Sequence, residues 1–137
     1  FDFLEYQKQA ADDSVPATPS IPHFFALAKQ LEHMIREETL PARYERHRRM
    51  RDITLERTAK YARLASDPAF ASVTVSALEP SHNDAETIRY AMKERGFTIG
   101  GGYGEWKERT FRIGHMGDIP LDALSAMLDV LEEVARG

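Results

Sequence analysis

The sequence contains no cysteine, and this absence excludes several kinds of chemistry. A chain without cysteine forms no disulfide, no thiolate metal site and no cysteine nucleophile. The chain also has no apolar run of the length that crosses a bilayer, and its first residues, FDFLEYQKQ, lack the basic and apolar regions of a signal peptide. These features predict a cytoplasmic protein with no membrane partner.

An excess of positive charge is absent as well. The formal net charge is -4, and the sequence pI is about 5.7, so the chain as a whole does not attract nucleic acid. Hydrophobic residues make up 42% of the 137 residues and charged residues 29%, which is the balance of a folded protein. We therefore expect a single core and no nucleic-acid partner.

Apolar residues at helical spacing predict helices in the first half of the chain. A short helical pattern over residues 1–9 runs into the proline-rich loop DDSVPATPSIP. The prolines require the next helix to start after Pro22, and apolar side chains recurring from Phe24 to Ile35 predict that one face of this helix packs on a core. A further helix is predicted from Ala42 to about Ala65.

The middle of the chain predicts a strand and then a capped helix. Residues 70–78 are rich in β-branched side chains, which is typical of a strand. Asn83 and Glu86 have the spacing of a capping box, and Gly96 stands where a helix ends in a left-handed residue. The helix is therefore predicted over Asp84–Arg95.

The last third predicts two paired strands and a closing helix. Residues 97–99 and 110–113 have short strand patterns on either side of a glycine cluster, GGGYG. Asp118 and Pro120 supply start signals for an amphipathic helix that runs to Gly137. The whole order predicts an α+β fold in which a small three-stranded sheet, antiparallel or mixed, is covered by helices.

The arginines between positions 43 and 51 have two interpretations. They could form a basic groove for nucleic acid, but Glu45, Asp52 and Glu56 are interleaved with them. This pattern favours a solvated helix with ion pairs such as Arg48 with Asp52.

Histidines do not predict a metal site. No two of the five histidines stand four positions apart, which is the i,i+4 spacing typical of a zinc-binding helix. We interpret His115 as a side chain packed in a turn, and His33 and His82 as surface residues.

The glycine run from Gly100 to Gly104 also has two interpretations. It is not a dinucleotide-binding fingerprint, because a strand pattern follows it instead of a helix. It is either a flexible hairpin loop or a loop whose missing side chains let a ligand or another backbone segment approach closely.

Arg112 is the most informative single residue. It lies between Phe111 and Ile113 in the strand-like segment FRIGHMGD, so its side chain is expected to point away from the face of its apolar neighbours. A partly buried guanidinium requires a carboxylate or phosphate partner. An internal salt bridge and a bound anionic ligand would both satisfy it.

Three segments together resemble the carboxyl-terminal portion of class V pyridoxal-phosphate aminotransferases. They are TPSIP before a long helix, GGGYGEWK and FRIGHMGD, and the resemblance covers nearly the whole chain. The family includes alanine-glyoxylate, serine-glyoxylate and archaeal-type phosphoserine aminotransferases. The resemblance implies the small carboxyl-terminal domain of a fold-type I transferase that uses pyridoxal 5'-phosphate.

The resemblance also implies roles for two residues. Arg112 matches the arginine that binds the α-carboxylate of the amino acid substrate. Thr18 matches a threonine that reaches the cofactor phosphate of the neighbouring subunit, and Pro16 stands where some relatives carry a tyrosine. The implied protein is a homodimer that transfers an amino group between serine, alanine or phosphoserine and a 2-oxo acid such as glyoxylate.

The family's catalytic residues are not found in this chain. Its Schiff-base lysine lies upstream of the matched region, and no lysine here has a matching context, so the resemblance implies no catalytic residue and an inactive isolated chain. Residues 1–20 are then a linker and loop from an upstream large domain, and residues 21–137 form the small domain. The alternative is a stand-alone α+β module for ligand binding or dimerisation.

Overall fold

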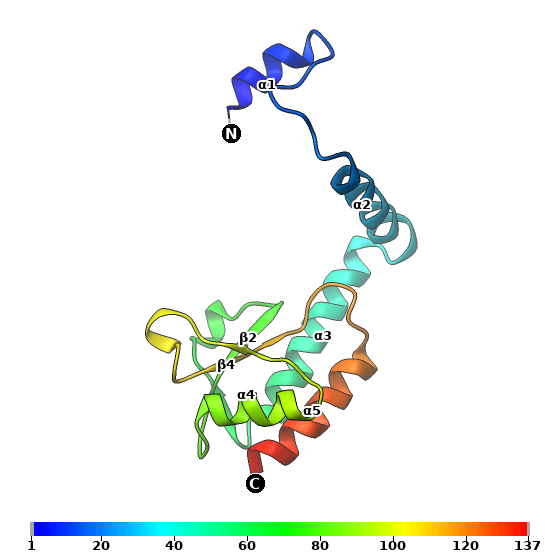
Figure 1. The fold of residues 1–137 in the computed structure, drawn as a ribbon. Helices are drawn as coiled ribbons and strands as arrows, with labels where there is room; N and C mark the ends of the chain where they lie inside the picture. The colour runs from blue at the N-terminus through cyan, green and yellow to red at the C-terminus, as the bar shows by residue number, and fades with distance from the viewer. Residues whose placement is uncertain (1, 137) are drawn as a thin grey trace. The chain divides into compact units, whose positions relative to one another are not determined.

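The computed structural model of the chain describes residues 2–136. Phe1 and Gly137, where the predicted first and last helices begin and end, lie outside the described residues. The chain divides into two compact units, Phe1–Leu40 and Pro41–Gly137, and each is described by itself (Figure 1).

The first unit is helical. Helix α1 spans Phe3–Ala10, as the pattern over residues 1–9 predicts, and Asp2 caps it by accepting hydrogen bonds from the backbone of its first turn. Helix α2 spans Ile21–Glu32 and continues into a short π-helix, η1, over His33–Glu37. None of the residues 2–40 is buried.

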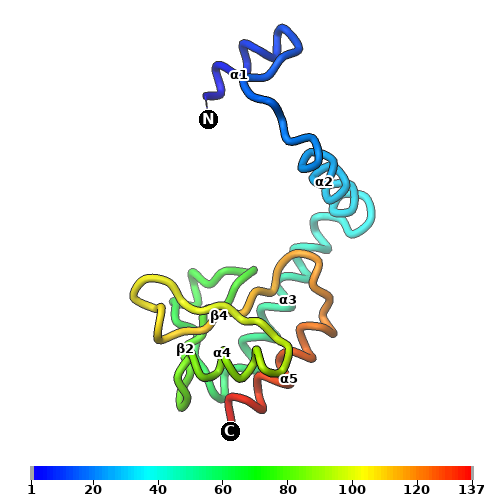
Figure 2. The backbone as a smooth tube through the Cα atoms, viewed as in Figure 1, coloured from blue at the N-terminus to red at the C-terminus, as the bar shows by residue number. Residues whose placement is uncertain are grey.

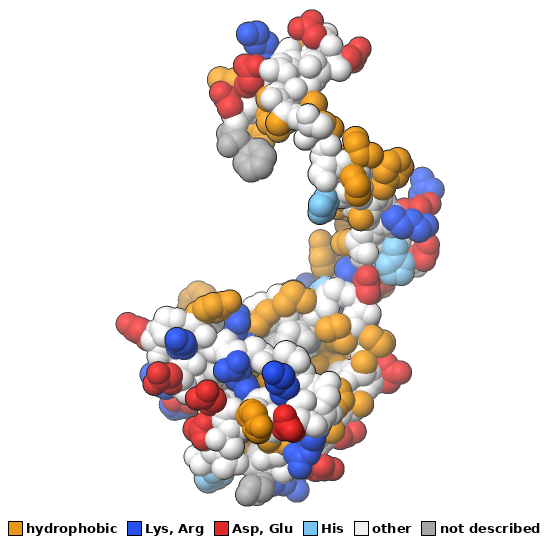
Figure 3. Space-filling model, in the orientation of Figure 1, with side chains coloured by type: hydrophobic (Ala, Val, Ile, Leu, Met, Phe, Trp, Pro, Cys, Tyr) orange, Lys and Arg blue, Asp and Glu red, His pale blue; other side chains and the backbone are white. Residues whose placement is uncertain are grey.

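Helix α2 differs from its prediction in two ways. It begins at Ile21, before Pro22, because a proline in the first turn of a helix removes an N–H that has no intrahelical acceptor. Its apolar side chains are exposed instead of packed within this unit, and hydrophobic side chains gather on the face of α2 seen in Figure 3. Phe24, Phe25 and Leu27 are 62%, 74% and 55% exposed.

The second unit is built on a four-stranded sheet. Its strands are β1 (Ala62–Leu64), β2 (Val75–Pro80), β3 (Gly100–Gly101) and β4 (Phe111–Gly114), in the order β1-β2-β4-β3. Every neighbouring pair is antiparallel, and the backbone trace of β2 and β4 can be followed in Figure 2. The predicted α+β fold class is confirmed, with antiparallel pairing and one more strand than predicted.

The register of the sheet sorts side chains onto two faces. Leu78 of β2 pairs with Phe111 of β4, and both side chains are buried in the core. The next pair, Ala77 and Arg112, is only partly buried, because successive side chains on a strand point to opposite faces. Arg112 therefore lies on the face opposite the core, as its sequence context predicts.

Three helices complete the core of the second unit. Helix α3 spans Leu40–Thr58, helix α4 Ala85–Glu94 and helix α5 Leu121–Arg136, as Figure 1 shows. Helices α4 and α5 each contribute a stripe of buried side chains to the cluster that also holds Phe111 and Ile113, and α3 contributes Met50. Among residues 2–136, no helix combines the length and the apolar character needed to cross a membrane.

The helix predicted from Ala42 to about Ala65 is too long. Helix α3 ends at Thr58, and the segment that follows forms β1 instead. The apolar spacing continues through this segment, but Arg63 and Leu64 pair with Glu79 and Leu78 of β2. Pairing with a strand distant in sequence therefore overrides the local helical pattern.

The start of strand β2 and the cap of helix α4 also differ from the predicted ones. The strand predicted over residues 70–78 begins only at Val75, because Pro68–Phe70 form a short 3-10 helix, η2, whose first turn is capped by the side chain of Asp67. The cap of α4 is Asp84, which accepts from the backbone N–H of Thr87 at 2.8 Å. Asn83 instead donates to the carbonyl of Ala135.

Candidate functional site

Arg112 lies near the middle of β4 with its guanidinium on the open face of the sheet. Its Nε donates a hydrogen bond of 2.5 Å to the carbonyl oxygen of Gly101 on the neighbouring strand. Its Cζ lies 4.3 Å from the centre of the Tyr103 ring, which is the distance of a cation–π contact. The guanidinium is thus held by one backbone bond and one aromatic face.

An internal salt bridge of Arg112 is not found among residues 2–136, where no carboxylate forms an ion pair with this guanidinium. The five N–H donors of the group exceed the one acceptor that residues 2–136 supply. The sequence allows two kinds of partner for Arg112, an internal carboxylate and a bound anion. Among the described residues, only the bound anion remains open.

The glycine run has no side chains, and this leaves space for the arginine side chains beside it. A Cβ on Gly100 would lie 3.3 Å from Nη2 of Arg112, and one on Gly101 would lie 2.9 Å from Nη1 of Arg89. A Cβ on Gly102 would lie 2.1 Å from the carbonyl oxygen of Trp106, which is closer than atoms can approach. Of the two interpretations of this loop, the geometry favours close backbone approach.

The loop and β4 border a pocket at the edge of the sheet. Arg89, Lys107 and Arg112 line it, and three acidic side chains line it as well. The remaining lining residues, the acidic ones included, are Asp84, Ala85, Glu86, Gly101, Gly102, Tyr103, Glu108 and Thr110. Arg112 is therefore accessible to a small ligand from this pocket.

One carboxylate beside the sheet forms ion pairs with two arginines. Glu79 of β2 accepts from Arg63 at 2.7 Å and from Arg109 at 2.9 Å. These bonds hold the pKa of the Glu79 carboxyl below its usual value. No local signal in the sequence predicts this triad, because it depends on the pairing of β1 with β2.

The basic residues of α3 anchor the turn after β4. The buried Arg43 forms an ion pair of 2.7 Å with Asp118. Arg46 donates to the carbonyl oxygens of Gly117 and Ile119 at 2.9 and 3.0 Å. These contacts position the GHMGD turn that follows Arg112.

Elsewhere on α3, the ion pairs differ from the predicted one. Arg48 lies 3.6 Å from Glu45, whereas Asp52 is paired with Arg51 at 2.7 Å instead of with Arg48.

His115 is a packed side chain, as its sequence context predicts. It is fully buried, and its Nδ1–H donates a hydrogen bond of 3.2 Å to the carbonyl oxygen of Val73, which can only accept. The Nε2 atom then accepts from the hydroxyl of Ser76 at 2.9 Å. Burial lowers the pKa of the imidazole, so His115 is held neutral.

The buried imidazole predicts a pH dependence of stability. Because its pKa in the folded chain is below the ordinary value of 6.5, the unfolded chain binds the proton more readily, and stability falls as pH decreases below about 6.5. Urea unfolding between about pH 5 and 8 should show this slope, and it should be reduced in His115→Gln. The exposed His82 gives the control variant His82→Gln, which should keep the slope. An unchanged slope in His115→Gln would contradict the assignment.

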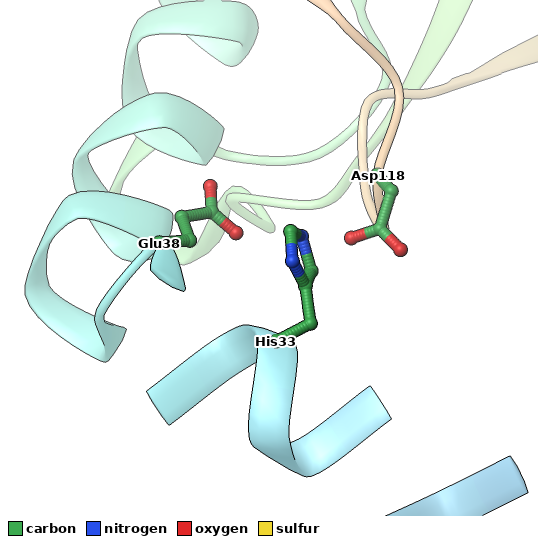
Figure 4. A group of neighbouring side chains, drawn as sticks. All are labelled: His33, Glu38 and Asp118. Atoms are coloured by element: carbon green, nitrogen blue, oxygen red, sulfur yellow. The ribbon is translucent and has the colours of Figure 1, made fainter. Parts of the chain in front are cut away.

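Three further side chains are drawn in Figure 4. His33 and Glu38 belong to the first unit and Asp118 to the second. Because the two units are described separately, these side chains are not treated as one metal site.

Comparison with known proteins gives sequence relatives much longer than this chain. A comparison with protein-family models gave no match. The chain is 38% identical to the soluble hydrogenase small subunit of Synechococcus sp., over 97% of this chain and 36% of that protein. It is 32% identical to the serine-glyoxylate aminotransferase of Methylorubrum extorquens, over 87% of this chain and 30% of that enzyme. The chain thus spans about a third of the length of these relatives.

Solved structures share the fold. The alanine-glyoxylate aminotransferase of Nostoc sp. superimposes with a TM-score of 0.79 at 22% identity, over 90% of this chain and 33% of that one. A subgroup IV aspartate aminotransferase from Thermus thermophilus gives 0.83 at 21% identity, over 98% of this chain and 38% of that one. These similarities confirm the predicted resemblance to aminotransferases, and the solved structures show that the chain shares the fold of about a third of each.

The two residues implied by the resemblance lie in different units. Arg112 is in the second unit, and Thr18 is in the loop before α2 of the first. Thr18 is exposed, and its hydroxyl forms no hydrogen bond within residues 2–136. A free hydroxyl of this kind fits a phosphate supplied from outside the chain.

No lysine among residues 2–136 is suited to carry the cofactor. All five lysines are exposed: Lys8, Lys29, Lys60, Lys93 and Lys107. An activated lysine needs a desolvated or cationic environment that lowers its pKa. The residues present therefore fit the periphery of a pyridoxal-phosphate site and not its centre.

Proposed function

We propose that this chain is the carboxyl-terminal part of a pyridoxal-phosphate-dependent aminotransferase. The complete protein transfers an amino group between a small amino acid, such as serine, alanine or phosphoserine, and a 2-oxo acid such as glyoxylate. The observation that carries the proposal is Arg112, a guanidinium without a carboxylate partner among the described residues, lining a pocket in a domain with the class V fold. The similarity to the serine-glyoxylate aminotransferase supports the same reaction class.

In this proposal Arg112 binds and orients the substrate. A planar guanidinium accepts a carboxylate in one orientation through two parallel hydrogen bonds. The amino acid and the oxo acid both carry an α-carboxylate, so one residue serves both halves of the reaction. The bound pyridoxal 5'-phosphate supplies the electron sink, and the chain orients the substrate relative to it.

Thr18 is proposed to donate a hydrogen bond to the cofactor phosphate of the neighbouring subunit. Its free, exposed hydroxyl supports this role, and the role requires a homodimer. We also propose that residues 1–20 link to an upstream large domain and residues 21–137 form the small domain. The complete protein is proposed to be cytoplasmic, and the isolated chain to be inactive without the upstream lysine.

The similarity to a protein named as a hydrogenase subunit supplies a competing function. We favour the aminotransferase, because solved aminotransferases share the fold and Arg112 offers a group that binds a substrate carboxylate. The test below separates the two functions.

The proposal is tested on the protein expressed from its natural reading frame. After borohydride reduction, we expect an intact mass several times 15.6 kDa with a reduced pyridoxyl adduct, and transfer of the amino group of L-serine or L-alanine to glyoxylate. A mass near 15.6 kDa without adduct would instead identify a stand-alone module. Hydrogen-dependent reduction of a viologen dye without transamination would support the hydrogenase.

A further inference from the structure

Arg112 is restrained on three sides by the loop that precedes its strand. Its Nε is bound to the Gly101 carbonyl at 2.5 Å, and the missing side chain of Gly100 leaves room for Nη2. The Tyr103 ring covers one face of the guanidinium, with its centre 4.3 Å from Cζ. Only the edge that carries the two Nη atoms lacks a partner among residues 2–136.

The path of the loop places the Tyr103 ring over the guanidinium of Arg112. The N–H of Gly102 donates to the carbonyl of Thr110 at 3.0 Å, and the tight space at Gly102 excludes any side chain. The short 3-10 helix η3 then starts at Gly104, which has a positive φ of 54°. The loop therefore turns back directly after Tyr103 and leaves its ring over β4.

The position of Tyr103 is not explained by packing. Its side chain is 76% exposed and belongs to no part of the buried core. An exposed aromatic ring over a cation gains a modest electrostatic attraction, which fixes the plane of the guanidinium. The Nε bond fixes its rotation within that plane.

We propose that Tyr103 is a positioning residue for Arg112, which sets the guanidinium so that a substrate carboxylate binds end-on through Nη1 and Nη2. This inference rests on the proposed function, because it requires that Arg112 binds the carboxylate. The side-on mode through Nε and Nη2 is closed to the substrate, since Gly101 already occupies Nε. Tyr103 thereby contributes to affinity for every substrate with an α-carboxylate and leaves the chemical step unchanged.

The test compares variants of the full-length protein loaded with its cofactor. Tyr103→Leu should raise the KM for L-alanine, L-serine and glyoxylate by about two- to fivefold, with kcat unchanged. Tyr103→Phe keeps the ring and should stay within about twofold of the parent. Tyr90, an exposed tyrosine of α4, supplies the control Tyr90→Leu, which should leave both constants unchanged.

A substrate without a carboxylate separates positioning from a general structural effect. The rate of amino transfer from a simple primary alkylamine should be the same in the parent and in Tyr103→Leu. Equal losses for the amine and for L-alanine would overturn the proposal, as would equal losses in Tyr103→Phe and Tyr103→Leu.

The two proposals fail in different ways. An unchanged KM in Tyr103→Leu, with a large rise in Arg112→Ala, would overturn the role of Tyr103 and leave the carboxylate site intact. An unchanged KM in Arg112→Ala would overturn the carboxylate site itself.

Discussion

Arg112→Ala in the full-length protein is expected to weaken binding of both substrates by about 2–5 kcal/mol, which corresponds to a rise in KM of at least about thirtyfold. The substitution leaves the substrate carboxylate without its charged partner in the pocket. The measurement is steady-state kinetics with L-alanine and glyoxylate, each varied at saturating concentration of the other. Both KM values should rise, because both molecules present a carboxylate to the same guanidinium.

The matched control is Arg63→Ala. Arg63 is also an arginine of the sheet, but it is 74% exposed, and its partner Glu79 keeps its ion pair with Arg109. Its removal should change the stability and the KM values little, since exposed ion pairs contribute at most about 1 kcal/mol. Equal KM changes in Arg63→Ala and Arg112→Ala would show that positive charge on the sheet matters, and not the site at Arg112.

Phe111→Ala is expected to destabilise the second unit by about 3–5 kcal/mol. Phe111 precedes Arg112 on β4, but its side chain is fully buried in the core, where alanine would leave a cavity. The fluorescence of Trp106, the single tryptophan, reports unfolding of this unit in urea. The midpoint should fall by more than about 1 M.

Phe70→Ala tests whether burial causes this effect. Phe70 belongs to the same unit but is 85% exposed, so its removal should change stability by less than about 0.5 kcal/mol. Arg112→Ala should also leave the urea midpoint close to that of the parent, because Arg112 is outside the core cluster. If Phe70→Ala were as destabilising as Phe111→Ala, the assignment of the core would be wrong.

Local sequence signals predicted helices α4 and α5 best. The helix over α5 is predicted from its start signals and apolar stripe, and Gly96 does have a positive φ, of 86°, after α4. These features depend on residues within a few positions of one another. Backbone conformation and helical periodicity act over that range, so the sequence is sufficient for them.

The pairing of strands that are distant in sequence was not predictable from local signals. Strand β1 was assigned to a helix, because nothing near Arg63 indicates that Glu79 will lie beside it. Strand β3 falls on Gly100–Gly101, residues with little strand preference, because β4 supplies the pairing. Both strands exist only through contacts with residues distant in the chain.

The same distinction between local signals and non-local contacts applies to the candidate site. The sequence alone identified Arg112 as a guanidinium in need of an anion, placed it opposite the core face of its strand, and indicated the class V resemblance. Only the tertiary structure decided that no carboxylate among the described residues satisfies it and that Gly101 and Tyr103 hold it. The reason is physical: residue type and alternation fix what a side chain requires, whereas the path of the glycine loop determines which groups come within reach of it.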